Sequence, residues 1–107
     1  MEVDWDKVLS NAGQAALGKL NSHLPLVANA VKTQTAAMVE NGKFIERNKH
    51  SMTAAEYDMV KRIYTLAAAS VFQSFEAIGI VAAQQAAEAA WNVIATALKT
   101  AAGISFI

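Results

Sequence analysis

The chain has 107 residues, enough for one domain at most, and its nine Lys and Arg balance nine Asp and Glu. This zero net charge argues against a general electrostatic binder of nucleic acid or anionic lipid, and the absence of cysteine excludes disulfides, thiol catalysis and Cys-based metal sites. The first residues lack the basic region and apolar run of a Sec-type signal peptide, so we expect a cytoplasmic protein or part of an assembled particle.

Residues 1–42 predict two short amphipathic helices. Apolar residues recur at three- and four-residue steps across residues 3–21, which is the spacing of one face of a helix. A second helix is expected to begin just before Pro25, because a proline in the first helical turn loses no backbone hydrogen bond. The pair Asn41-Gly42 is typical of a helix end, so we expect the second helix to end there.

A charged connection, residues 43–53, leads to a long Ala-rich helix that is expected over residues 54–102. Thr53 and Glu56 have the spacing of a capping box, in which each side chain accepts a hydrogen bond from the backbone N–H of the other residue. No proline interrupts the chain after this point, and Gly103 is the first clear stop. A helix of this length would extend roughly 70 Å at ~1.5 Å per residue.

The predicted long helix cannot be enclosed by the two short ones, which would span only about 24–30 Å each. Either it bends near Gly79 and folds back on itself, or other copies of the chain bury it. Turn-forming residues are missing around Gly79, so a sharp reversal is not expected. We therefore predict a single all-α domain, residues 1–107, in which two short amphipathic helices and one long Ala-rich helix pack in a helical homo-oligomer.

The long helix has a wide apolar face and a polar arc when its residues are placed at about 100° per step. Small residues let another helix approach closely, so the apolar face predicts an oligomer interface made by Phe72, Phe75, Gly79, Ala82, Ala83, Ala86, Ala90, Val93 and Ala97. The polar arc either faces solvent around a bundle or lines the lumen of a ring or tube. The predicted lumen or subunit contacts are Gln73, Glu76, Gln84 and Glu88, of which only Glu76 lies outside the arc.

Residues 63–83 are long enough, at ~20 residues, to cross a bilayer. Eight large apolar residues in this window favour insertion by roughly 2–5 kcal/mol in total, but Glu76 near its centre costs about 2.5–3.5 kcal/mol and nearby polar residues add to that cost. The balance is near zero, so a membrane span is not favoured. A membrane-active or pore-forming helical protein is the alternative that the sequence leaves open.

The apolar tail, residues 103–107, has no charged side chain to solvate it, so we predict a docking peptide made by Ile104, Phe106 and Ile107. Patterns for catalysis and ligand binding are missing. His23 and His50 have no metal-ligand spacing, and the chain contains no Gly-rich phosphate loop or nucleophile elbow. We therefore expect no enzyme activity, no cofactor, no metal ion and no specific nucleic acid partner.

The layout of short helices, a long apolar-rich helix and an uncharged tail resembles that of small subunits of helical tubes and of phage virion or secretion assemblies. This resemblance implies a structural role but assigns no role to single residues. The leading prediction is a non-enzymatic structural subunit that self-assembles through the Ala-rich face, as a ring, tube or virion- or secretion-type assembly, with a second protein of the same assembly as a further partner. An adaptor whose apolar arm docks a different protein is a third hypothesis.

Overall fold

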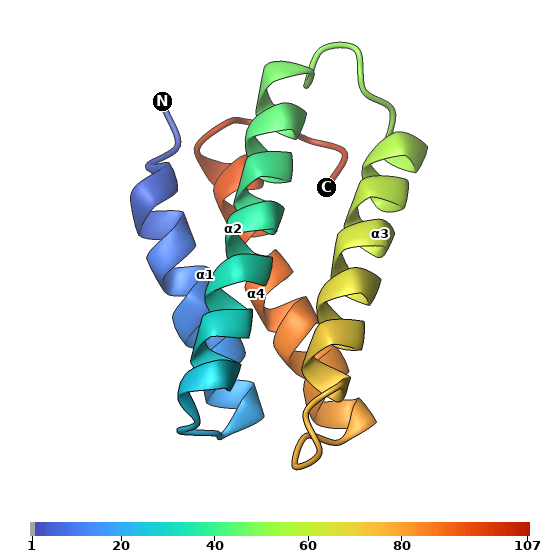
Figure 1. The fold of residues 1–107 in the computed structure, drawn as a ribbon. Helices are drawn as coiled ribbons and strands as arrows, with labels where there is room; N and C mark the ends of the chain where they lie inside the picture. The colour runs from blue at the N-terminus through green and yellow to red at the C-terminus, as the bar shows by residue number, and fades with distance from the viewer. Residues whose placement is uncertain (1) are drawn as a thin grey trace.

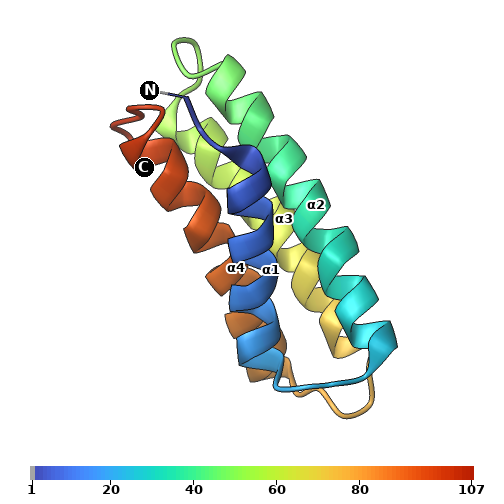
Figure 2. The same ribbon diagram turned by 90° about the vertical axis from the view of Figure 1, so that its left-hand side faces the viewer.

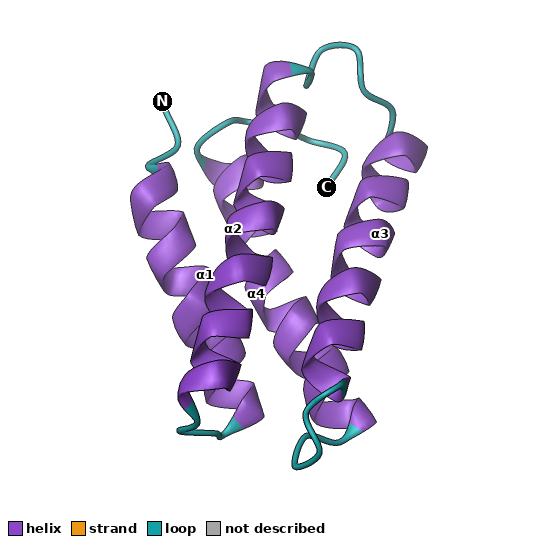
Figure 3. Ribbon diagram, in the orientation of Figure 1, coloured by secondary structure: helices purple, strands orange, loops and turns teal. Residues whose placement is uncertain are grey.

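The computed structural model describes residues 2–107, and within this range the chain forms four α-helices and no strand. The helices are α1 (Trp5–Leu20), α2 (Pro25–Arg47), α3 (Ala54–Gln73) and α4 (Ile80–Thr100) (Figure 1, Figure 3). The all-helical class predicted from the sequence is confirmed. The predicted number of helices is wrong, because four helices take the place of three.

Consecutive helices run antiparallel, so the chain passes down and up through a four-helix bundle (Figure 1, Figure 2). Helices α2 and α4 pack against each other across the bundle, whereas α1 and α3 lie diagonally apart. Both ends of the chain lie at the same end of the bundle as the connection between α2 and α3 (Figure 1). The turn between α3 and α4 lies at the opposite end.

The first helix and the start of the second lie where the sequence predicts them. The Asp4 side chain accepts a hydrogen bond from the Lys7 N–H at 3.2 Å, which satisfies one of the free backbone donors at the start of α1. Asn21 follows α1 in the left-handed conformation, with φ of 50°, and its N–H closes the last turn of the helix. Pro25 is the first residue of α2, so its missing N–H costs no helical hydrogen bond.

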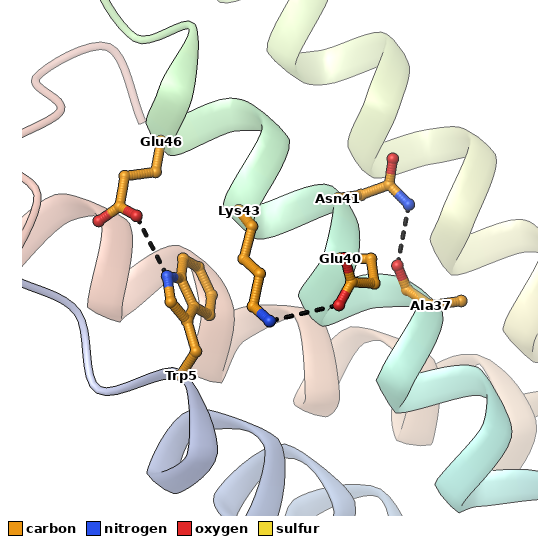
Figure 4. A network of polar contacts seen from close by, with 6 residues as sticks. All are labelled: Trp5, Ala37, Glu40, Asn41, Lys43 and Glu46. Carbon is orange, nitrogen blue, oxygen red and sulfur yellow. Dashed lines mark hydrogen bonds and ion pairs between the residues drawn. The ribbon is translucent and has the colours of Figure 1, made fainter.

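The predicted end of the second helix at Asn41-Gly42 is wrong, because α2 continues to Arg47. Gly42 is buried, and a Cβ atom there would lie 2.7 Å from the ring of Trp5. The missing side chain therefore makes room for the indole and does not end the helix. The indole Nε1 donates a 3.1 Å hydrogen bond to a carboxylate oxygen of Glu46, one turn further along α2 (Figure 4).

The charged connection between the second and third helices is shorter than the predicted 43–53, because residues 43–47 belong to α2. The predicted capping box at the start of α3 is confirmed. Thr53 Oγ1 accepts the Glu56 N–H at 3.1 Å, and Glu56 Oε1 accepts the Thr53 N–H at 2.9 Å. These two bonds are local to the start of α3 and satisfy two of its backbone N–H groups.

The predicted continuous helix over residues 54–102 is wrong. Helix α3 ends at Gln73, residues 74–79 form a turn, and α4 begins at Ile80 and runs back along α3 (Figure 1). Within the turn, the Ile78 N–H donates to the carbonyl three residues earlier at 3.0 Å, and the Ile78 side chain is buried. An apolar side chain inserted into the bundle therefore anchors a turn that lacks the usual turn residues.

Burial of apolar surface explains why the chain reverses where local propensity favours a continuous helix. The reversal brings together two apolar faces of one chain, whose fully buried members include Ala68, Phe72, Ala83, Ala90, Trp91 and Ile94. Removing such side chains from water contributes roughly 1.5–3 kcal/mol for each large one, which exceeds the cost of interrupting a helix. The chain therefore covers its own apolar arm, which the sequence predicts to be covered by other copies.

Candidate interaction surface

Most of the nine residues predicted to form an oligomer interface lie inside the bundle of a single chain. The residues of this set that have no exposed surface are Phe72, Ala83, Ala86 and Ala90. The residues that are partly buried against the core are Phe75, Ala82, Val93 and Ala97, and Gly79 is exposed in the turn. An oligomer built through the Ala-rich face would need the bundle to open and expose these residues. The Ala-rich interface therefore stays a prediction, which applies only to an open form of the chain.

Helices α1 and α4 pack against each other, and both bury alanine residues. Ala12 and Ala16 of α1 are fully buried, as are Ala86 and Ala90 of α4. Of all helix pairs, α1 and α4 have the most extensive backbone contact. Small side chains allow two helix axes to approach closely. The Ala-rich face therefore serves a close contact between two helices of one chain.

The four polar residues predicted to line a lumen or a subunit contact are all exposed. Gln73 is the last residue of α3, Glu76 lies in the turn, and Gln84 and Glu88 lie on α4. They are thus distributed over two helices and a turn and do not follow one long helix. A role of these residues around a lumen stays a prediction. Glu76, the charge outside the polar arc, is now explained by its place in an exposed turn.

The predicted docking tail lies on its own bundle. Gly103 has a φ of 71°, and the following N–H, of Ile104, donates to the carbonyl of Leu98 at 3.1 Å, which closes the end of α4. The buried or partly buried side chains of the tail are Ile104, Phe106 and Ile107. The Phe106 ring packs edge-on against Tyr57 of α3, with 5.8 Å between ring centroids. Docking of the tail onto another protein stays a prediction.

A buried polar contact joins α3 to α4. The Trp91 Nε1 donates a 2.8 Å hydrogen bond to the hydroxyl oxygen of Tyr57. Burial raises the pKa of Tyr57, and this effect exceeds the lowering by the hydrogen bond from Trp91. The phenol therefore stays neutral at physiological pH and acts as a hydrogen-bond acceptor inside the core.

An open groove of about 670 Å³ lies between the start of α1 and the end of α4. Its apolar lining comes from Val3, Val8, Val93 and Ala97. Over residues 2–107, no group of three His, Cys, Asp or Glu side chains could hold a metal ion. His23 and His50 are both exposed and lie in separate connections. The groove thus brings together no set of groups with an evident chemical task.

The surface also carries a row of large apolar side chains on α3. Met59, Ile63 and Leu66 are 62%, 53% and 59% exposed, and their spacing of four and three residues places them on one face of the helix. We call these three residues the α3 stripe. Phe44 of α2 is 44% exposed and lines a shallow pocket together with Met59, so the apolar surface continues onto α2.

Arg62 lies within the length of the α3 stripe, between Met59 and Ile63, and Glu76 lies in the turn just after α3. Between these two charges, the thirteen residues from Ile63 to Phe75 contain no charged side chain. Among the residues that the structure describes, the only ion pair joins Lys43 to Glu40, so Arg62 and Glu76 form none within the chain.

The α3 stripe was missed in the sequence because the turn was missed. When α3 and α4 are treated as one helix, Ile63 and Leu66 become part of one wide apolar face. In the structure, the buried side of α3 carries Tyr57 and Phe72, and the stripe lies on the other side. The sequence of residues 54–73 has apolar residues on two sides of the helix. This pattern is typical of a helix that packs against neighbours on both sides.

The segment 63–83, which is the alternative membrane span, is divided by the turn between α3 and α4. None of the helices within residues 2–107 combines the length and the hydropathy needed to cross a bilayer. In comparisons with known proteins, no family model, no curated protein and no solved structure matches this chain. The surface of the bundle is therefore the basis for a functional proposal.

Proposed function

We propose that the protein is a non-enzymatic structural subunit that self-associates, and that the α3 stripe forms the contact. The observation that carries this proposal is the exposure of Met59, Ile63 and Leu66, each of which has more than half of its surface in contact with solvent. Single exposed apolar residues are common on soluble proteins, but a continuous apolar patch indicates a binding surface.

The lack of charged residues on the exposed side of α3 favours a second copy of the chain as the binding partner. The centre of a protein interface is depleted of charged residues, and homodimer interfaces are more apolar than others. The exposed side of α3 from Ile63 to Gln73 fits this description, because it presents Leu66, Ala67 and Ser70 and no charge. A two-fold contact needs a surface that is complementary to itself, and an uncharged apolar face meets this condition.

This proposal keeps the predicted self-assembly but changes the contact surface from the Ala-rich face to α3. A pair formed through α3 alone is closed, because both copies use the same surface. A ring, a tube or a virion- or secretion-type assembly would need a further contact in addition to this one. The pair is thus proposed as the unit from which any larger assembly is built.

The test is the mass of the protein in detergent-free solution, measured by size-exclusion chromatography with light scattering over a range of concentrations. We expect the unaltered protein to associate and the double variant Ile63→Glu, Leu66→Glu to be monomeric, because two buried carboxylates would oppose the contact. The matched control is Leu26→Glu on α2, since Leu26 is 73% exposed and lies outside the stripe.

Circular dichroism should show the same helix content for the unaltered protein, the double variant and the control variant, because the replaced side chains are exposed. A monomeric mass of the unaltered protein at every concentration would refute the proposal, and so would association of the double variant as strong as that of the control. Association that appears only as aggregation relieved by detergent would favour the membrane-active alternative instead.

A further inference from the structure

Arg62 and Glu76 have opposite signs and lie at opposite ends of the uncharged segment 63–75. Arg62 lies on α3, roughly 16 Å before the end of the helix at Gln73 at ~1.5 Å per residue, and Glu76 lies in the turn that follows. Both side chains are exposed, and neither forms an ion pair within the chain. This arrangement gives α3 a direction that a second copy can recognise.

We infer that two copies of the chain pair with their α3 helices antiparallel, so that Glu76 of each copy faces Arg62 of the other; this inference rests on the self-association proposed above. The symmetry axis then passes near the middle of the uncharged segment 63–75. The same ion pair forms twice, once at each end of the contact. Parallel helices would place Arg62 beside Arg62 and Glu76 beside Glu76, and like charges that face each other across an interface oppose binding.

The side chains along α3 fit this register. The exposed residues closest to the axis are Ala67 and Ser70, whose small side chains allow the two helices to approach closely. The large residues of the stripe lie toward the ends of the contact. Met59 of one copy is carried past the end of α3 in the other copy, toward the turn at residues 74–79, so apolar surface is covered at both ends.

A charge reversal tests the ion pairs. We expect Arg62→Glu and Glu76→Arg, each alone, to raise the dissociation constant of the pair by roughly three- to tenfold, because each creates two sets of facing like charges. The double variant Arg62→Glu, Glu76→Arg restores opposite signs and should return the dissociation constant to within about twofold of the unaltered protein. Sedimentation velocity at low salt measures these constants.

A single introduced cysteine tests the direction of the helices, since the chain has no cysteine of its own. Ser70→Cys lies next to the symmetry axis, so the two copies of Cys at this position are close enough for a disulfide. Met59→Cys lies on the same face, but its two copies would be about 30 Å apart. Under mild oxidation we expect Ser70→Cys to form a covalent dimer at least tenfold faster than Met59→Cys.

The outcomes separate this inference from the proposed function. If the protein associates through the stripe but Met59→Cys is cross-linked as fast as Ser70→Cys, or the double charge reversal fails to restore affinity, the antiparallel register is wrong and the self-association stands. If the unaltered protein is monomeric at every concentration, both are wrong. Rapid cross-linking of Ser70→Cys alone, together with restored affinity in the double reversal, supports the register.

Discussion

Gly42 lies beneath the indole ring of Trp5, so the absence of a side chain at this position sets how closely α1 approaches α2. In an exposed helix, Gly→Ala stabilises by up to about 1 kcal/mol. At Gly42 a Cβ would lie 2.7 Å from Trp5 and 2.9 Å from Ile94, and overpacking of a core costs about 1–3 kcal/mol. We therefore expect Gly42→Ala to lower the free energy of unfolding by roughly 0.5–2 kcal/mol.

Gly18 provides the matched control for this substitution. It also lies within a helix, but a Cβ there would meet no atom within 4 Å. Gly18→Ala should raise the free energy of unfolding in urea by as much as about 1 kcal/mol. Equal effects at the two positions would show that the Trp5 ring does not pack as described.

Tyr57 should make the stability of the protein depend on pH in the alkaline range. Its pKa is raised in the folded state from an ordinary value of 10.0, so the unfolded chain loses the phenolic proton first. The contribution of Tyr57 to stability is thus complete below pH 10 and is lost as the pH rises through the folded-state pKa. Urea unfolding measured between pH 8 and pH 11 should show this decline.

The control for the alkaline decline is Tyr57→Phe. This variant should be less stable by about 1–3 kcal/mol at neutral pH, because the buried Trp91 N–H loses its acceptor. Its stability should fall less steeply above pH 10 than that of the unaltered protein. Parallel pH profiles for the two proteins would contradict the assignment to Tyr57.

At the scale of helices, the contact between α1 and α4 depends on small side chains. Ala86 has no exposed surface, so a larger residue there must push the two helices apart. We expect Ala86→Leu to lower the free energy of unfolding by about 1–3 kcal/mol through overpacking. Ala36→Leu on the exposed side of α2 should change it by less than about 0.5 kcal/mol. Thermal unfolding of the two variants at equal concentration gives the comparison.

The ends of the helices could be predicted wherever a local side chain determines them. The capping box of Thr53 and Glu56, the proline at the start of α2 and the stop at Gly103 all act within a few residues. The continuation of α2 through Gly42 and the break after Gln73 depend on distant residues. Sequence spacing contains no information on a tryptophan that packs against Gly42 from another helix.

The candidate surface was hidden for a related reason. A helical pattern shows which residues share a face, but which face points inward depends on the neighbouring helices. On α3 both Phe72 and Leu66 belong to apolar faces, and only the position of α4 shows that Phe72 is buried and Leu66 exposed. The predicted interface and the observed core are therefore largely the same residues, whereas the proposed interface lies on the other side of α3.

At the scale of the whole molecule, the turn at residues 74–79 gives the chain helices of matched length. A continuous arm of roughly 70 Å could not be covered by two short helices, but helices of 20 and 21 residues span about 30 Å each. Helices α1 and α2 then cover them along most of their length. The arm is thus covered within one chain, and the proposed self-association through α3 would add to a bundle that is already closed.

The uneven burial of the helices has a consequence for local opening. Helix α4 buries seven side chains, from Ala83 to Leu98, whereas α3 buries only Tyr57, Ala68, Ala69 and Phe72. Segments with few buried apolar contacts detach first in the fluctuations of a folded protein. Helix α3, which presents the stripe, is therefore held less firmly than α4. A second copy seated on α3 would help to keep this part of the bundle closed.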